Sequence, residues 1–287
     1  MLLSLLLLQT AAPAVRSTLT GVFKSPRVTE SSGVVVSRTH PGILWTHNDS
    51  GDRPYLYATD LHGNDRGAIL VSGADFVDWE DLSSGPCPIG RGSCLYIADT
   101  GDNQERRKRV TIYAVPEPEP PRSAADTQRV TAAAFALSLR YPDGSHDLEA
   151  IYVSPRDTAV YLVSKGWSGA IRLYRVTRAA WSGKGVTTAE RLQTLPIKPI
   201  PSRARLATGA AIRPDGLLVA IRTYIDVFFF RPGLDGRLAI VRRPPCSLIG
   251  VETRGGEAIA FLDDSTLVIT SEANRIGRGT IHTLQCP

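Results

Sequence analysis

Two segments place carboxylates and other polar residues directly after an apolar run. The segment "ILWTHNDSG" supplies His47 and Asp49, and "YIADTGDN" supplies Asp99 and Asp102. Closely spaced carboxylates can coordinate a hard cation such as Ca²⁺, or act as a general acid and a general base. An EF-hand loop needs Asp or Asn at alternate positions, and the second segment breaks this pattern at Gly101. The spacing argues against an EF-hand loop and leaves another kind of carboxylate site open.

Further polar residues stand at the ends of other apolar runs. Before such runs the chain carries Glu30, Glu80, Glu149, Thr208 and Glu257. After the runs that follow, it carries His47, Asp49, Asp99, Asp102, Lys165, Arg222, Tyr224 and Glu272. The sequence contains no GxSxG, GxGxxG, Walker or HExxH motif. These residues suit a polar ligand or a metal ion, but no motif identifies a reaction, and whether the protein is an enzyme stays open.

The elements that must position these residues form a repeat. Five groups of short apolar runs follow one another, and their opening residues are separated by 50, 69, 59 and 49 residues. The runs are rich in Val, Ile, Leu and Tyr and are bounded by Gly, Pro, Asp and Asn, which is typical of strands and turns. Repeated units of three or four strands at this spacing indicate propeller blades. We predict an all-β fold, a β-propeller of five blades, with six blades as the alternative.

The fifth group lacks an outer strand, whereas a spare apolar segment, "TLTGVF" at residues 18–23, precedes the first group. We predict that this N-terminal strand pairs into the last blade, because closing the ring removes an exposed sheet edge. The propeller is expected to form one domain over residues 15–287. Residues 1–14 are mostly apolar and end in Ala-Pro-Ala, which predicts a signal peptide.

The cysteines and the charge indicate the compartment and the partners. Cys87 and Cys94 flank a Pro/Gly turn, so we prefer their pairing and that of Cys246 with Cys286 among the three possible connectivities. Disulfides fit a secreted or periplasmic protein.

The net charge is +5, and the basic residues are scattered apart from "ERRKR" at residues 105–109, which we interpret as a solvated loop. We expect no nucleic-acid partner and no stable membrane insertion.

In a propeller, the starts of the inner strands and the ends of the second strands meet at one mouth of the central channel. The predicted ligand-binding residues at this mouth are Glu30, His47, Asp49, Glu80, Asp99, Glu149, Lys165, Arg222, Glu257 and Glu272. Buried charges are rare unless they are paired or bind a metal. One interpretation is therefore structural, with Lys165 and Arg222 neutralising the glutamates.

Two functional interpretations compete with the structural one. In the first, calcium is the cofactor, and its predicted ligands are Asp49, Glu80, Asp99 and Asp102. The protein would then be a ligand-binding or scaffolding propeller for a small polar ligand or an extracytoplasmic partner protein. In the second, the mouth hydrolyses a phosphoester, an ester or a sugar-like substrate. The catalytic candidates for this activity are Glu149, Lys165, Arg222 and Tyr224.

A family resemblance supports the predicted architecture. The ordered segments "WTHNDSG", "DWEDL", "YIADTGDN", "IYAVPEP", "LEAIYV", "TGAAIRPDG", "AIRTY" and "SEAN" resemble a mostly uncharacterised family of exported bacterial β-propellers over nearly the whole mature chain. "DLEAI" is also distantly similar to the acidic segment of SdiA-regulated and esterase-like-phytase propellers. This resemblance implies export, with calcium or phosphoester chemistry. The metal-rich motifs of phytases are absent, and Thr208 stands where the other groups have Glu.

Overall fold

The computed structural model describes residues 15–126, 128–200, 205–251, 255–273 and 277–287. The predicted signal peptide, residues 1–14, lies outside the described residues. Within the described ranges, no helix is both long and apolar enough to cross a membrane. The ordered elements are almost all strands, and a short 3-10 helix, η1 (Arg178–Ser182), lies between two of them.

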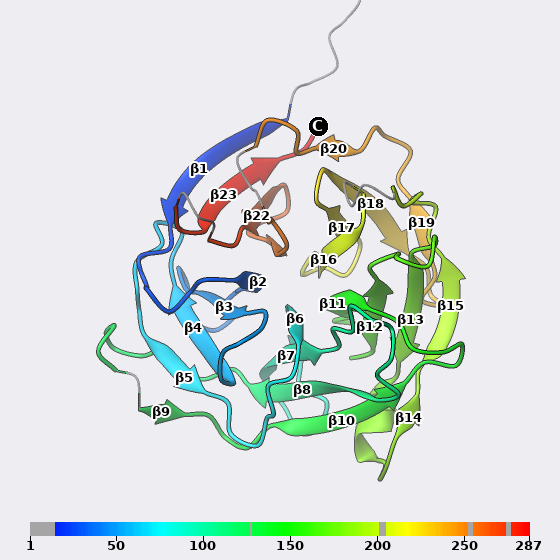
Figure 1. The fold of residues 1–287 in the computed structure, drawn as a ribbon, viewed down its shortest axis with the longest axis horizontal. Helices are drawn as coiled ribbons and strands as arrows, with labels where there is room; N and C mark the ends of the chain where they lie inside the picture. The colour runs from blue at the N-terminus through cyan, green and yellow to red at the C-terminus, as the bar shows by residue number, and fades with distance from the viewer. Residues whose placement is uncertain (1–14, 127, 201–204, 252–254, 274–276) are drawn as a thin grey trace, which may run out of the picture.

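Five sheets lie around one central axis and form the blades of a propeller (Figure 1). The first blade contains β2 (Ser31–Val36), β3 (Leu44–Asn48), β4 (Tyr55–Thr59), β5 (Ala68–Leu70) and β9 (Arg129–Val130). The second contains β6 (Trp79–Pro86), β7 (Ser93–Asp99), β8 (Val110–Pro116), β10 (Phe135–Arg140) and β14 (Thr187–Thr188). The third contains β11 (Leu148–Val153), β12 (Val160–Ser164), β13 (Arg172–Val176) and β15 (Glu190–Thr194).

The fourth blade contains β16 (Ala207–Ile212), β17 (Val219–Thr223), β18 (Asp226–Pro232), β19 (Leu238–Ile240) and β20 (Cys246–Ser247). The fifth contains β21 (Ile259–Phe261), β22 (Thr266–Thr270), β23 (Thr280–Gln285) and β1 (Arg16–Val22). The structure confirms the predicted five blades and excludes the alternative of six.

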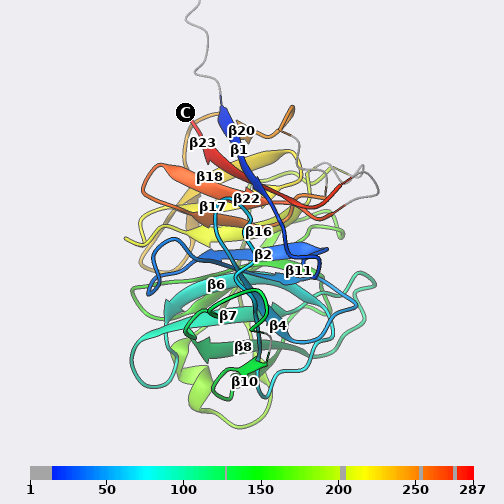
Figure 2. The same cartoon turned by 90° about the vertical axis from the view of Figure 1, so that its left-hand side faces the viewer.

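The ring closes in the predicted way. The N-terminal strand β1 runs antiparallel to β23 at the outer edge of the fifth blade, with Arg16 opposite Gln285. Figures 1 and 2 both show these two strands side by side. Two disulfides join Cys87 to Cys94 and Cys246 to Cys286, as predicted. The second of them ties the C-terminal segment of the fifth blade to β20 of the fourth blade.

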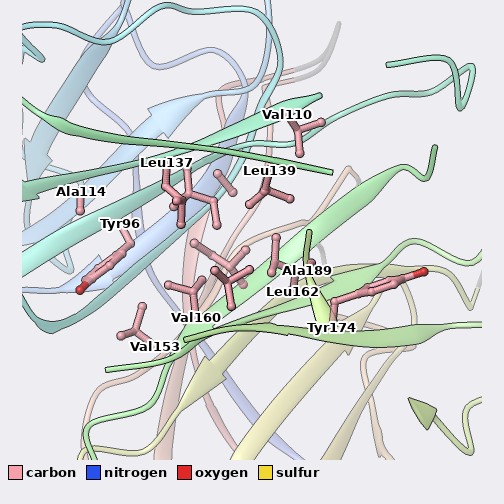
Figure 3. Close-up of a cluster of buried hydrophobic side chains, with 14 of the residues drawn as sticks. Tyr96, Val110, Ala114, Leu137, Leu139, Val153, Val160, Leu162, Tyr174 and Ala189 are labelled. Carbon is pink, nitrogen blue, oxygen red and sulfur yellow. The ribbon is translucent and has the colours of Figure 1, made fainter. Parts of the chain in front are cut away.

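The hydrophobic core lies between neighbouring blades. The inner strands β11 and β16 are buried along their whole length, whereas the outer strand β10 alternates between exposed and buried residues. A strand covered on both faces needs apolar residues at successive positions, and this explains the continuous apolar runs in the sequence. Between the second and third blades, Tyr96, Leu139, Val153, Val160 and Leu162 belong to one such layer (Figure 3).

Candidate functional site

Polar residues gather where the inner strands begin. The register of four inner strands shifts there, between Ser31 and Gly33, Trp79 and Leu82, Leu148 and Ala150, and Ala207 and Gly209. A β-bulge bends a strand locally and re-aims a side chain. The residues within these irregularities are Ser32, Glu80, Asp81, Glu149 and Thr208, and all of them are polar. The bulges therefore collect polar groups at one end of the channel.

Carboxylates form a continuous chain at this end. We call their set the acidic mouth, and it consists of Asp49, Asp78, Glu80, Asp147, Glu149, Glu257 and Glu272. They make three overlapping triads: Asp49–Glu257–Glu272, Asp49–Asp78–Glu80 and Glu80–Asp147–Glu149. Within each triad, one ligand atom per residue lies within 4.8 Å of the others. Each triad offers only oxygen donors, and this is the ligand set of a hard cation.

Burial and mutual repulsion raise the pKa values of these carboxyl groups. Burial, followed by repulsion from Glu257 and Asp78, raises the pKa of Asp49 to about 7. Burial and the nearby Glu257 raise the pKa of Glu272 to about 8. Burial and Asp147 raise the pKa of Asp78 to about 6. Near neutral pH the acidic mouth must therefore hold protons or acquire a positive partner.

Lys165 supplies positive charge on one side of the acidic mouth. Its Nζ lies 2.5 Å from Glu149 Oε1 and 3.8 Å from Asp147 Oδ2. Burial alone would lower the pKa of Lys165, but the surrounding Glu149, Tyr224 and Asp147 raise it overall. Trp167 donates from its indole N–H to Asp147 Oδ2 at 3.0 Å, and Lys165 Nζ lies 5.7 Å from its ring. The charge of Glu149 is thus balanced by an ammonium group.

Glu80 is placed differently from Glu149. Glu80 is only 2% exposed, and no donor in the described part of the chain makes a hydrogen bond to its carboxylate. It belongs to two of the three triads. Burial and then repulsion from Glu149 and Asp49 raise its pKa well above the usual range. The backbone of Gly101 lies so close that a Cβ there would collide with Glu80 Oε1 and with Asp78. The fold therefore buries this carboxylate without giving it a partner.

Asp99 and Asp102, two of the predicted calcium ligands, lie beside Arg107. Arg107 Nη2 donates to Asp99 Oδ1 at 2.8 Å, and the Arg107 backbone N–H donates to Asp102 Oδ2 at 2.6 Å. The backbone N–H of Asp102 in turn donates to Asp147 Oδ1 at 2.8 Å. Of the predicted ligand set, only Asp49 and Glu80 share a carboxylate triad. The sequence shows that Asp99 and Asp102 are polar residues at a strand end, but it does not reveal that Arg107 contacts both and neutralises Asp99.

Two other candidates are fully buried between blades. Arg222 is 0% exposed and donates from Nη1 to the carbonyls of Ala258 at 2.6 Å and Thr270 at 2.9 Å. Burial lowers the pKa of Arg222 to about 10. His47 is also 0% exposed, donates from Nδ1 to the Asn48 carbonyl at 2.9 Å, and has its pKa lowered to about 4 by burial. In this conformation neither side chain is accessible to a ligand from solvent.

The remaining candidates line the rim or link blades. Glu30 is half-buried ahead of β2 and accepts from the Ser50 backbone N–H at 3.4 Å. Tyr224 donates to Glu257 Oε1 at 3.4 Å, and Ser32 donates to Glu257 Oε2 at 3.1 Å. The fourth blade contributes Thr208 and Tyr224 but no carboxylate to the triads. The acidic mouth is consequently an arc over the other four blades.

Sequence reasoning missed Asp78, Asp147 and Asp81. The first two precede Glu80 and Glu149 by two residues, and residues two apart lie on the same side of a strand. The repeated Asp-x-Glu pattern in "DWEDL" and "DLEAI" could therefore have revealed them. No sequence pattern of this kind marks Asp81, because only the bulge in β6 sets the direction of its side chain.

Asp81 lies fully buried below the acidic mouth. Its Oδ2 accepts from the backbone N–H of Ile151 at 2.8 Å and of Ala210 at 3.1 Å, and its Oδ1 accepts from the N–H of Leu82 at 2.8 Å. Ile151 belongs to β11 and Ala210 to β16, so one carboxylate from β6 joins three inner strands. This contact links the second blade to the third and fourth blades across the channel.

Comparison with known proteins shows the fold and not a family. No family model matches the chain, and no curated protein matches it significantly. The structure is similar to the PQQ-bound form of aldose sugar dehydrogenase from Streptomyces coelicolor, with 13% identity over 96% of this chain and 100% of that chain, at a TM-score of 0.54. The likeness to SdiA-regulated and phytase-like propellers stays a prediction.

Two proteins from Bacteroides thetaiotaomicron also match at low identity. An auxiliary nutrient binding protein is 9% identical over 93% of this chain, with a TM-score of 0.49. The match spans 64% of that protein, which is less than two thirds of its length. A structural genomics protein of unknown function is 9% identical over 96% of this chain and 76% of its own, with a TM-score of 0.48. At these identities the likeness concerns the fold alone.

Proposed function

We propose that this chain is an exported ligand-binding propeller whose acidic mouth binds a divalent cation, and that calcium is this cation. The buried carboxylate of Glu80 carries the proposal, because it has no hydrogen-bond donor among the described residues and is shared by two triads. Burying an unpaired carboxylate is costly, and a metal ion would offset that cost. Calcium prefers six to eight oxygen ligands and tolerates irregular geometry, so it suits an arc of carboxylates better than Mg²⁺ does.

A bound cation would also give the acidic mouth a way to hold a ligand. Coordination positions not filled by the protein can accept hydroxyl or carboxylate oxygens from a small polar molecule. Trp167 lies at the rim with 36% of its surface exposed and offers an apolar ring beside the carboxylates. The two disulfides fit an oxidising compartment, and export would produce a mature chain that begins near Val15. Mass spectrometry of the secreted protein would show this mature end.

Calorimetry tests the proposed cation site. Protein stripped with EDTA is titrated with CaCl2, and its melting temperature is recorded with and without the metal. We expect binding heat and a higher melting temperature, because a ligand of the native state stabilises it. Glu80→Gln should weaken calcium binding about tenfold or more, since it removes one charged ligand from the set.

A matched control is Glu119→Gln, because it makes the same change in a carboxylate whose side chain is 80% exposed and lies outside the acidic mouth. This variant should bind calcium as the wild type does. An EDTA-treated protein that shows neither heat nor a change in melting temperature with CaCl2 would refute the cation site. Equal affinity of Glu80→Gln and the wild type would refute the role of Glu80.

Hydrolysis is a second candidate, supported by the pKa values of two carboxyl groups. Asp49, with a pKa of about 7, and Glu272, with a pKa of about 8, suit proton transfer near neutral pH. Assays with phosphoesters, carboxylic esters and glycosides test this candidate. Any activity should fall at least a hundredfold in Glu272→Gln if this group transfers a proton. Activity unchanged in both Asp49→Asn and Glu272→Gln would remove these residues from the mechanism.

A further inference from the structure

A second cavity opens at the other end of the channel, where the inner strands finish. It has a volume of about 300 Å³, within the range of small-molecule sites. It is lined by Arg38, Ser84, Gly85, Pro86, Gly92, Ser93, Val153, Pro155, Ile212, Arg213 and Pro214. The walls are therefore mostly apolar, and no acidic residue is among the described residues that line them. This composition is opposite to that of the acidic mouth.

The cavity contains one guanidinium group without a carboxylate partner. Arg213 is paired with Asp215, whose Oδ2 lies 2.6 Å from Arg213 Nη2. Arg38 donates from Nε to Ser84 Oγ at 3.4 Å, and no carboxylate of the described chain lies within ion-pair distance of it. Partial burial of the guanidinium at the cavity rim lowers the pKa of Arg38, and Glu117 only partly opposes this effect. Arg38 thus presents unused N–H donors at the rim of an apolar cavity.

We propose that this cavity binds a small amphiphilic carboxylate, an alkyl or aryl acid whose carboxylate pairs with Arg38 and whose apolar body contacts Val153, Pro155 and Ile212. A guanidinium group matches a carboxylate with two parallel hydrogen bonds. The cavity has apolar walls and, as far as the described residues show, a single cation without a carboxylate partner, so it should favour an anion with one charged end. This site is separate from the proposed cation site, because it lies where the inner strands end and shares no lining residue with the acidic mouth.

Three probes of similar shape and different charge test the site. The intact protein is titrated calorimetrically with 4-phenylbutyrate, 4-phenylbutanol and 4-phenylbutylamine. The acid should bind at least tenfold more tightly than the alcohol, and the amine should bind most weakly, because only the acid can pair with a guanidinium. Equal binding of the three probes, or no binding of the acid at millimolar concentration, would overturn the proposal.

Variants of Arg38 test the charge of this side chain separately from its shape. The residue is exposed, so these changes leave the hydrophobic core intact. Arg38→Met should lower the affinity for 4-phenylbutyrate to that for the alcohol, whereas Arg38→Lys should keep part of the preference. Arg242→Met is the control, because it removes the same charge from an exposed arginine outside the cavity. An equal loss in Arg38→Met and Arg242→Met, or no loss in Arg38→Met, would overturn the assignment. Adding calcium should leave the affinity unchanged in the wild type.

Discussion

The two ends of the channel have opposite chemistry although the same inner strands build both. At the acidic mouth the strands begin with bulges and with charged residues such as Glu80 and Glu149. At the other end they finish in apolar segments such as Pro86, Val153 and Ile212, with Arg38 at the rim. The middle of each strand is buried and packs between blades. A propeller can therefore vary the chemistry of each mouth independently, because the core depends only on the strand interiors.

Asp81 forms the boundary between the two ends. It accepts hydrogen bonds from the backbone of two other inner strands, so it links the inner strands of three blades. The two mouths thus differ in their balance of charge and in their carboxyl groups, because the raised carboxyl pKa values of Asp49 and Glu272 belong to the acidic mouth and no carboxyl group of the described residues lines the cavity at the other end.

The largest expected effect comes from removing the ammonium group of Lys165 inside the acidic mouth. Lys165→Met leaves the buried Glu149 without its ammonium partner, and loss of one member of a buried ion pair costs about 3–5 kcal/mol of unfolding free energy. Urea denaturation at pH 7 in EDTA measures this loss. The double variant Lys165→Met/Glu149→Gln should recover a large part of it. If the double variant is no more stable than Lys165→Met, the pair is not coupled, and the acidic mouth does not depend on internal neutralisation.

A smaller effect is expected at the boundary. Asp81→Asn replaces one acceptor oxygen by an amide that faces a backbone donor, so it should lower the unfolding free energy by about 2 kcal/mol. Asp263→Asn is a matched control, since Asp263 also accepts from backbone N–H groups of Ser265 and Thr266 but in an exposed turn. Urea denaturation should show a clearly smaller loss for the control. Equal losses would mean that the link between the inner strands adds nothing to the stability.

The smallest expected effect is a dependence of stability on pH above about 6.5 that arises from the carboxyl groups of the acidic mouth. A carboxyl group with a raised folded pKa binds more protons in the native state, so stability falls as pH rises toward that pKa. With Asp49 at about 7 and Glu272 at about 8, the melting temperature in EDTA should fall by a few degrees between pH 6.5 and 8.5. Below pH 6.5, His47 with its pKa of about 4 opposes this trend.

Differential scanning calorimetry measures this slope, and two variants locate its source. Glu272→Gln should make the slope shallower, whereas Arg38→Met at the other end should leave it unchanged. Calcium should reduce the slope as well, because the metal replaces protons as the partner of the carboxylates. A melting temperature that stays constant or rises over this range in EDTA would contradict the raised pKa values.

Much of the fold could be predicted because its signals are local in the sequence. Short apolar runs between Gly and Pro residues identify strands, and their fivefold recurrence identifies blades. The spare segment at residues 18–23 and the missing outer strand of the last blade predicted the ring closure that β1 and β23 make. The spacing of Cys87 and Cys94 favoured the first disulfide, and the second pair followed from it.

The composition of the site was only partly predictable. The sequence by itself determined that acidic residues stand at strand ends, because a residue's place relative to an apolar run is visible along the chain. Only the tertiary structure decided that Asp99 faces Arg107, that Glu80 finds no donor in the described part of the chain and that Asp81 links three inner strands. These outcomes depend on bulges and on contacts between blades, where a shift of one residue turns a side chain to the opposite face.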